Sequence, residues 1–138
     1  MLSVENYLIR RAHDAGIKAL LMLGGDGADG DGFLASTHPA VRGVFVKNII
    51  DYLVTHNYDG VDVDWENQLG TATAQQRLIA LIDELRAESS TRTRYQPPHA
   101  PMLVTEVVAA LCGQLTLGRR RARRRARTSP CRLDVRGR

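Results

Sequence analysis

Near the middle of the chain lies the run Asp59-Gly60-Val61-Asp62-Val63-Asp64-Trp65-Glu66. From Val61 to Glu66, apolar side chains and carboxylates alternate. Successive side chains of a β-strand point to opposite faces, so this alternation predicts a strand with three acids on one face and three apolar residues on the other. Glu66 is expected to be the last residue of that strand.

The three acids, Asp62, Asp64 and Glu66, are an unfavourable way to build a sheet. Carboxylates along one strand face repel one another and resist removal from water. That cost is expected where the acids hold a shared proton, a metal or a substrate, and paired carboxylates in different environments are what acid–base chemistry needs. The alternative is an ordinary buried strand that ends in solvated acids.

The run resembles the DGxDxDWE signature of the glycoside hydrolase family 18 chitinases, with no substitution at the defining positions. Residues 18–25 are similar to the SxGG strand of the same family, with Gly24 and Gly25 matching. Met22 stands where the family has serine, so a polar partner that the resemblance implies near the inner acids, and for Asp62 in particular, is missing.

The resemblance implies hydrolysis of β-1,4-linked N-acetylglucosamine polymers, such as chitin, by a retaining, substrate-assisted mechanism. Glu66 would act as the catalytic acid and later as the base. Asp64 would orient the acetamido group of the substrate and stabilise the oxazolinium-like intermediate, and Asp62 would share a proton with Asp64. No metal or organic cofactor is implied.

The resemblance also assigns supporting roles to the neighbouring residues. Trp65, Gly24 and Gly25 are expected at the substrate-binding region, with Trp65 packed behind the acids. Asp59 and Gly60 are expected to shape the entrance to the acidic strand. The tyrosine with which the family grips the acetamido group has no counterpart here, and Tyr95 lies in a predicted loop.

Outside the acidic strand, helices and strands are expected to alternate. The spacing of apolar residues predicts helices over 3–15, from a Thr37 cap to about residue 56, and over 73–89; strands are predicted over 17–23 and 102–110, and loops over 24–32 and 92–101. This order predicts right-handed βαβ units and a parallel sheet.

The fold class implied by the resemblance is a fragment of a (β/α)₈ barrel, in which catalytic groups lie at the C-terminal ends of the strands. A complete barrel takes ~250 residues, and this chain has 138. We expect it to supply about three of the eight strands, the third to the fifth, as a partial catalytic domain over residues 1–111.

Charge divides the chain into two parts. Residues 1–117 carry nine Lys and Arg against fourteen Asp and Glu, whereas residues 118–138 carry ten Arg against one Asp. Residues 112–138 are therefore predicted to be a disordered arginine-rich tail, or a sequence read out of frame. An arginine-rich arm could bind nucleic acid through phosphates, but no interleaved aromatic residue or recognition fold accompanies it, so nucleic acid is not the expected partner.

Two further functions stay open beside the hydrolase: a non-catalytic fragment, and a chitinase-like protein that only binds carbohydrate. The expected partners are chitin or N-acetylglucosamine oligosaccharides, with no membrane, and the oligomeric state is left open. A secreted location is implied by the family, although the N-terminus shows no signal peptide. Cys112 and Cys131 have no metal-ligand spacing and are expected to be free thiols or one disulfide.

Overall fold

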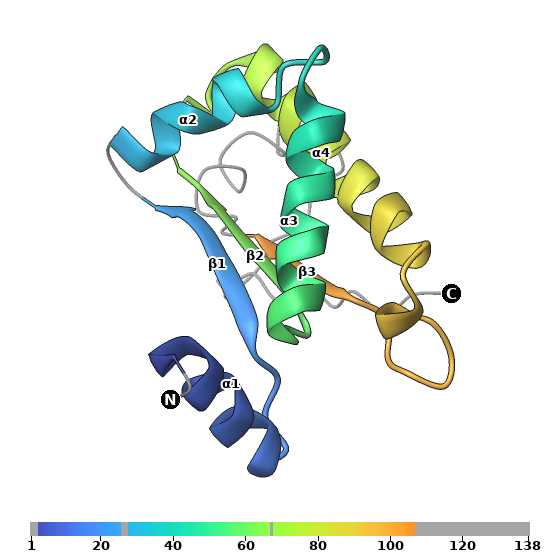
Figure 1. Ribbon diagram of the computed structural model, residues 1–138. Helices are drawn as coiled ribbons and strands as arrows, with labels where there is room; N and C mark the ends of the chain where they lie inside the picture. Colours follow the sequence, from blue (N-terminus) through green and yellow to red (C-terminus); the bar gives the residue numbers. More distant parts are fainter. Residues whose placement is uncertain (1–2, 26–27, 67, 107–138) are drawn as a thin grey trace, which may run out of the picture.

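The computed structural model describes residues 3–25, 28–66 and 68–106. Helices and strands alternate along these residues (Figure 1), as the predicted parallel α/β class requires. In chain order the elements are α1 (Val4–Asp14), β1 (Leu20–Gly25), α2 (Ala28–Ser36), α3 (Arg42–His56), β2 (Gly60–Trp65), α4 (Ala72–Ser90), the short 3₁₀ helix η1 (Thr93–Tyr95) and β3 (Leu103–Glu106).

The three strands form one parallel sheet with β2 in the centre. Asp62 pairs with Met22 of β1 on one side and with Thr105 of β3 on the other. Further along, Gly24 pairs with Asp64. Parallel strands have their carboxyl ends at the same edge, so the end of β1 lies beside the acidic end of β2.

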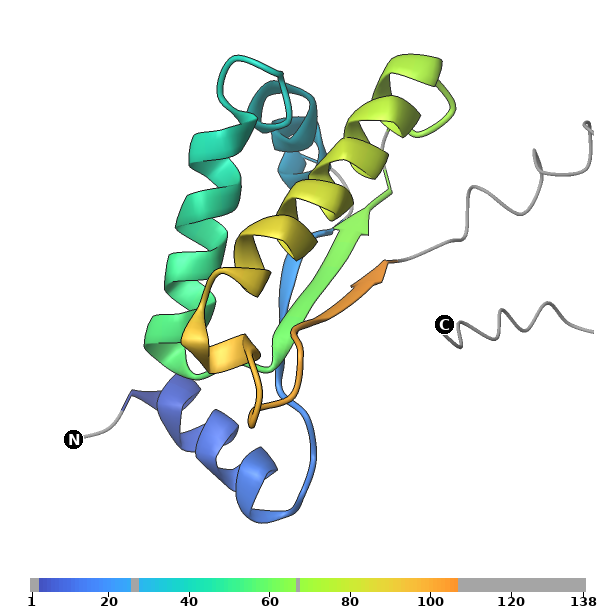
Figure 2. The same cartoon turned by 90° about the vertical axis from the view of Figure 1, so that its right-hand side faces the viewer.

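The core lies on one face of this sheet. Figure 2 shows α3 and α4 on the same side of the three strands. Val61, Val63 and Trp65 of β2 are at most 1% exposed and belong to the same core as the buried side chains of both helices. The helix residues in that core are Val46, Ile49, Ile50 and Leu53 from α3 and Ala74, Leu78, Leu81 and Leu85 from α4. The acids of β2 therefore face the other side of the sheet.

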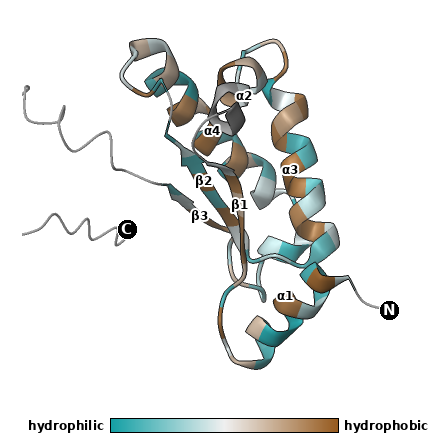
Figure 3. Cartoon of the chain, turned by 90° about the vertical axis from the view of Figure 1, so that its left-hand side faces the viewer, coloured by the Kyte–Doolittle hydropathy of each residue, from teal (hydrophilic) through white to brown (hydrophobic). Residues whose placement is uncertain are grey.

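The first helix is attached mainly by polar contacts. Ser3 caps α1 by accepting a hydrogen bond from the Asn6 N–H, and Ile9 is its only buried residue. Hydrophobic and hydrophilic segments alternate along α1 (Figure 3), and Val4 and Leu8 are exposed. At its start, Glu5 accepts hydrogen bonds from the hydroxyls of Tyr52 and Tyr58 at 2.8 and 2.9 Å.

The prediction of a loop over 24–32 is wrong at both ends of that range, because residues 24 and 25 belong to β1 and α2 begins at residue 28. Glycine is a poor helix former, so the two glycines of α2, at positions 30 and 32, concealed the helix from the sequence. The deciding interaction is distant in sequence: Phe33 is buried and stacks on Trp65, with ring centroids 4.9 Å apart and planes 14° apart. Tertiary packing thus overrides the local preference.

Thr37 does not cap α3, which starts five residues later than predicted, at Arg42. The Thr37 hydroxyl instead donates to the Phe33 carbonyl at 2.6 Å, because a buried hydroxyl needs a partner and the last turn of α2 supplies one. Glu66 lies one residue beyond the end of β2 rather than within it. Of the strand predicted over 102–110, the structure describes β3, and residues 107–110 lie outside the described part.

Gly60 lies directly against the backbone of β3. A Cβ atom added at Gly60 would lie 2.1 Å from the Leu103 carbonyl oxygen. We expect Gly60→Ala to lower the free energy of unfolding by about 1–3 kcal/mol, the usual cost of inserting a methyl group into packed surroundings. Urea denaturation followed by circular dichroism measures it.

Gly43→Ala is the matched control for that substitution, because nothing lies within 4 Å of an added Cβ in α3. The control should be neutral or slightly stabilising, since alanine favours a helix. Equal denaturation midpoints for Gly60→Ala and the unchanged chain would contradict the close approach.

Candidate active site

The three acids of this segment differ in their exposure to solvent. Asp62 and Asp64 are half-buried, and Glu66, just past the strand end, is exposed. All three follow the register of the face opposite the core. The strand therefore presents a line of carboxylates whose last member is the most accessible to a molecule at the C-terminal edge of the sheet.

Asp62 has different neighbours on its two sides. On β1 its register partner is Met22, which is 62% exposed and offers no hydrogen-bond donor from its side chain. On β3 its partner is Thr105, whose hydroxyl donates to Asp62 Oδ1 at 2.5 Å. The expectation that Met22 supplies no polar contact holds, but the carboxylate is nevertheless hydrogen-bonded from the opposite strand.

Asp64 carries a buried oxygen without a partner. Its Oδ1 atom is inaccessible and accepts no hydrogen bond from any of the residues that the structure describes. An unsatisfied buried carboxylate oxygen is costly, and such atoms call for an explanation such as a ligand or a proton held in common. Asp62, two residues earlier on the same strand face, is an acid that could share that proton.

Gly24 allows the end of β1 to lie directly beside Asp64. Its φ angle is +103°, and an added Cβ would lie 2.5 Å from the Asp64 carbonyl oxygen and 2.4 Å from the Phe33 ring. Gly25 also has a positive φ, of +127°. Both glycines thus lie at the acidic end of the sheet, where substrate binding was predicted; that role stays a prediction.

Trp65 points away from the acids. Its side chain is 1% exposed and packs in the core against Phe33. Its indole Nε1–H has no hydrogen-bond partner among the described residues. In this structure Trp65 supports the strand from behind, and a direct contact with a substrate stays a prediction.

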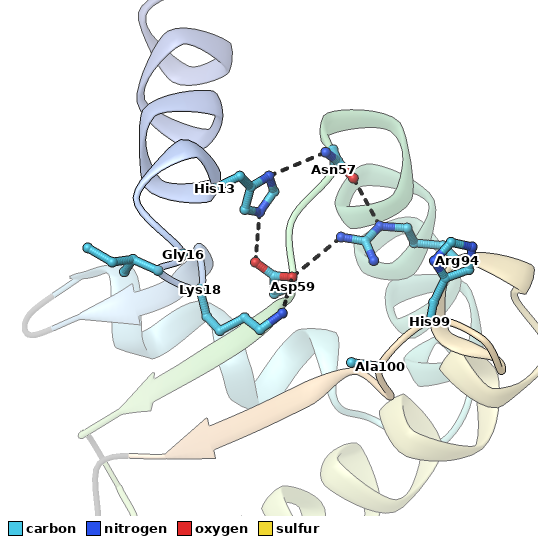
Figure 4. A pocket seen from close by; sticks show the side chains of 9 residues that line it. His13, Gly16, Lys18, Asn57, Asp59, Arg94, His99 and Ala100 are labelled. Atoms are coloured by element: carbon cyan, nitrogen blue, oxygen red, sulfur yellow. Dashed lines mark hydrogen bonds and ion pairs between the residues drawn. The ribbon is translucent and has the colours of Figure 1, made fainter.

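A second cluster of charged residues surrounds Asp59 at the opposite end of β2 (Figure 4). The carboxylate is 7% exposed and makes ion pairs with His13, Lys18 and Arg94 at 2.8, 3.1 and 3.4 Å. It also accepts a hydrogen bond from the Ala19 N–H at 2.9 Å. A pocket of about 360 Å³ adjoins this cluster.

These contacts set the charge state of Asp59. Burial by itself would raise its pKa, but the Ala19 N–H, His13 and Lys18 all favour the carboxylate and together lower the pKa to about 2. The cluster ties α1, the segment before β1 and η1 to Asp59, the residue directly before the central strand. Asp59 was predicted from the sequence only to shape the strand entrance; its partners were not identified.

The two clusters lie far apart. Six residues lie between Asp59 and Glu66 in the sequence, which corresponds to roughly 20 Å of extended chain. In parallel α/β barrels the chemistry takes place at the C-terminal ends of the strands. The Asp62–Glu66 end is therefore the candidate active site. The pocket beside Asp59 lies at the N-terminal end of the strand, the end that contributes to stability in such barrels.

The described residues also bear on metal binding and on membrane insertion. Within residues 3–25, 28–66 and 68–106, no group of three or more His, Cys, Asp or Glu side chains is arranged to hold a metal ion. None of the helices in that part of the chain is long and apolar enough to cross a membrane. The arginine-rich tail predicted over 112–138, with both cysteines, lies outside the described residues.

With this geometry in place, comparisons with known proteins define the class. The chain overlays on a GH18 chitinase of Cycas revoluta, solved in complex with (GlcNAc)₃, with a TM-score of 0.62 and 24% identity over 74% of this chain and 30% of that one. A class V chitinase from Nicotiana tobaccum gives a TM-score of 0.58 over 77% of this chain. The fold is thus a fragment of a (β/α)₈ barrel.

The family model of glycosyl hydrolases family 18 matches residues 5–113. The chain therefore belongs to glycosyl hydrolases family 18. It is 36% identical over 100 residues to a "Probable endochitinase" of Caenorhabditis elegans, covering 70% of this chain and 16% of that protein. It is 32% identical over 88 residues to a "chitinase-like effector" of Moniliophthora perniciosa, covering 58% and 20%. The chain thus spans a fifth or less of these relatives.

A similarity of another kind exists to ATP-dependent 6-phosphofructokinase of Yersinia pestis, with 28% identity over 114 residues, 83% of this chain and 30% of that protein. The family match and the structural overlays agree instead on the chitinase fold.

The ion pairs of Asp59 predict a pH-dependent stability. Its folded-state pKa is lowered to about 2 from an ordinary 3.8, so the stabilisation is complete above about pH 5 and is lost as the pH falls through 3.8 toward 2. The shift corresponds to about 2 kcal/mol. Asp59→Asn should be less stable than the unchanged chain by about that amount at pH 7, and the difference should shrink on acidification.

Chemical denaturation at a series of pH values from 7 to 2 measures the difference. Asp83→Asn is the control, because Asp83 is exposed on α4. A difference between Asp59→Asn and the unchanged chain that stays constant across this range would show that the carboxylate charge is not what stabilises the cluster.

Proposed function

We propose that this chain carries the catalytic strand of an enzyme that hydrolyses β-1,4-linked N-acetylglucosamine polymers with retention of configuration. The observation that carries the proposal is the line of carboxylates Asp62, Asp64 and Glu66, which ends at the C-terminal edge of a parallel sheet. Membership of family 18 and the (GlcNAc)₃ bound to the Cycas chitinase support chitin oligosaccharides as the substrate class.

Glu66 is the acid in the first step. The carbonyl oxygen of the substrate's own acetamido group attacks the anomeric carbon, the glycosidic C–O bond breaks, and Glu66 gives its proton to the leaving oxygen. In the second step the Glu66 carboxylate takes a proton from water, whose oxygen attacks the anomeric carbon and opens the cyclic intermediate. The exposure of Glu66 beyond the strand end supports this role.

Asp64 acts on the acetamido group. When that group attacks, it acquires positive charge, and a carboxylate nearby stabilises it. Asp62 shares a proton with Asp64, so that Asp64 can accept a hydrogen bond at one stage and carry charge at another. The unpartnered Oδ1 atom of Asp64 supports the proposal that a substrate group or a shared proton completes its hydrogen bonding.

A carbohydrate-binding protein without hydrolysis is the second candidate. Met22 favours it, because the family's serine is absent beside Asp62. The relative named a chitinase-like effector gives this candidate some support. Glu66 favours the hydrolase, since a binding protein has no need of the acid. An extracellular site of action, usual in the family, is proposed for either case.

Glu66→Gln separates the two candidates. Gln keeps the size of the side chain but cannot give or take the catalytic proton, so we expect hydrolysis of a fluorogenic chitooligosaccharide to fall by about 10²–10⁴-fold while oligosaccharide binding is retained. Steady-state fluorescence measures the rate, and calorimetric titration with the unlabelled oligosaccharide measures binding.

Asp83→Asn, which neutralises an exposed acid on α4, should cleave at the unchanged rate. Hydrolysis by Glu66→Gln at the parent rate would contradict the assignment of the acid. Saturable binding with no hydrolysis by the unchanged chain would favour the carbohydrate-binding candidate.

A further inference from the structure

Among the residues that the structure describes, the Asp62 side chain is hydrogen-bonded from one side, by Thr105. The register places Asp62 between Met22 and Thr105. The thioether of Met22 has no proton to donate, and its side chain is 62% exposed. The Thr105 hydroxyl lies 2.5 Å from Asp62 Oδ1. Distances of 2.5–2.7 Å are typical of a hydroxyl that donates to an ionised oxygen, and such bonds are roughly twice as strong as neutral ones.

The position of Thr105 makes this contact directional. Its hydroxyl is carried by a β-branched side chain, whose χ1 angle is restricted, on a strand paired with β2 from Gly60 to Val63. Thr105 is itself exposed, so its place opposite Asp62 in the register is what brings the donor to the carboxylate. The carboxylate of Asp62 is therefore held by its Oδ1 atom, which leaves Oδ2 as the oxygen that can turn toward Asp64.

We propose that Thr105 is a positioning residue for the acid pair, and that it supplies from β3 the polar contact that Met22 cannot supply from β1. The inference rests on the proposed hydrolase function of this same site. Thr105 acts through Asp62 and does not touch the substrate. Its hydroxyl fixes the orientation of the Asp62 carboxylate by binding one of its oxygens. The other oxygen then exchanges the shared proton with Asp64 in one defined orientation.

The contact from Thr105 explains how methionine can occupy residue 22 beside the acid pair. Without Thr105, the loss of a donor on β1 would leave the Asp62 carboxylate with no hydrogen-bond partner. An unsatisfied carboxylate in a half-buried site lowers stability and has no fixed orientation. With Thr105 in place, a methionine at residue 22 is compatible with a working acid pair. The absence of the serine then does not by itself identify a protein that has lost catalysis.

Thr105→Val and Thr105→Ser separate the hydroxyl from the shape of the side chain. Valine keeps the branched form and removes the donor, whereas serine keeps the donor and removes the methyl group. We expect Thr105→Val to lower kcat on a chitooligosaccharide by about tenfold or more, the usual effect of losing a hydrogen bond to a charged group, with KM within about twofold. Thr105→Ser should recover most of the loss.

Thr55→Val is the control, because it removes a hydroxyl from an exposed position of α3 on the far side of the molecule. It should leave both constants unchanged. Thr105→Val with unchanged kcat would overturn the proposal. A Thr105→Ser variant as slow as Thr105→Val would also overturn it, since packing of the methyl group rather than the hydroxyl would then be responsible.

A second measurement does not require catalysis. In the full chain labelled with ¹³C at aspartate side chains, exchange of the Thr105 hydroxyl proton for deuterium should shift the Asp62 carboxyl signal. The shift should be present in the unchanged chain and Thr105→Ser, and absent in Thr105→Val. If the unchanged chain shows no hydrolysis, the proposed function fails for this chain. The carboxyl shift then tests the hydrogen bond between Thr105 and Asp62 by itself. No shift in the unchanged chain would overturn that hydrogen bond.

Discussion

Burial of Val61, Val63 and Trp65 beneath α3 and α4 is the constraint on which the described structure depends. Fully burying such side chains stabilises a fold by about 1.5–3 kcal/mol each. A slip of one residue in the register of β2 would move Asp62 and Asp64 into the core, at a far larger cost. The hydrophobic face therefore holds the acids on the open side of the sheet, in the order that the proposed chemistry uses.

The two ends of β2 have different tasks. At its start, Asp59 is buried, ionised and surrounded by cations, and it fixes α1 and η1 to the strand. At its end, Asp64 is half-buried, and Glu66 lies beyond the strand and is exposed. A rigid start and an accessible end on the same strand position the acid without requiring that the loops around it be rigid, which agrees with how parallel barrels carry their active sites.

The sequence predicted what depends on local patterns, and it failed where distant contacts decide. Alternation in β2 and the apolar spacing of the helices fixed the fold class and the acids' common face. The helix α2 was not predicted, because its glycines oppose a helix and its stability comes from Phe33 on Trp65. The partners of Asp59 and Asp62 were also missed, because each lies 35 or more residues away from its aspartate in the sequence. Those partners are His13, Lys18, Arg94 and Thr105.

The central claim is that sugar chemistry occurs at the C-terminal edge of β2 and not in the pocket beside Asp59. Titration of the ¹⁵N-labelled chain with chitotetraose, followed by amide chemical shifts, tests it most directly. The account predicts saturable shifts at Gly25, Asp64 and Glu66, with His13 and Asn57 unmoved. Shifts confined to His13 and Asn57, or no saturable shift at the acidic edge, would contradict it.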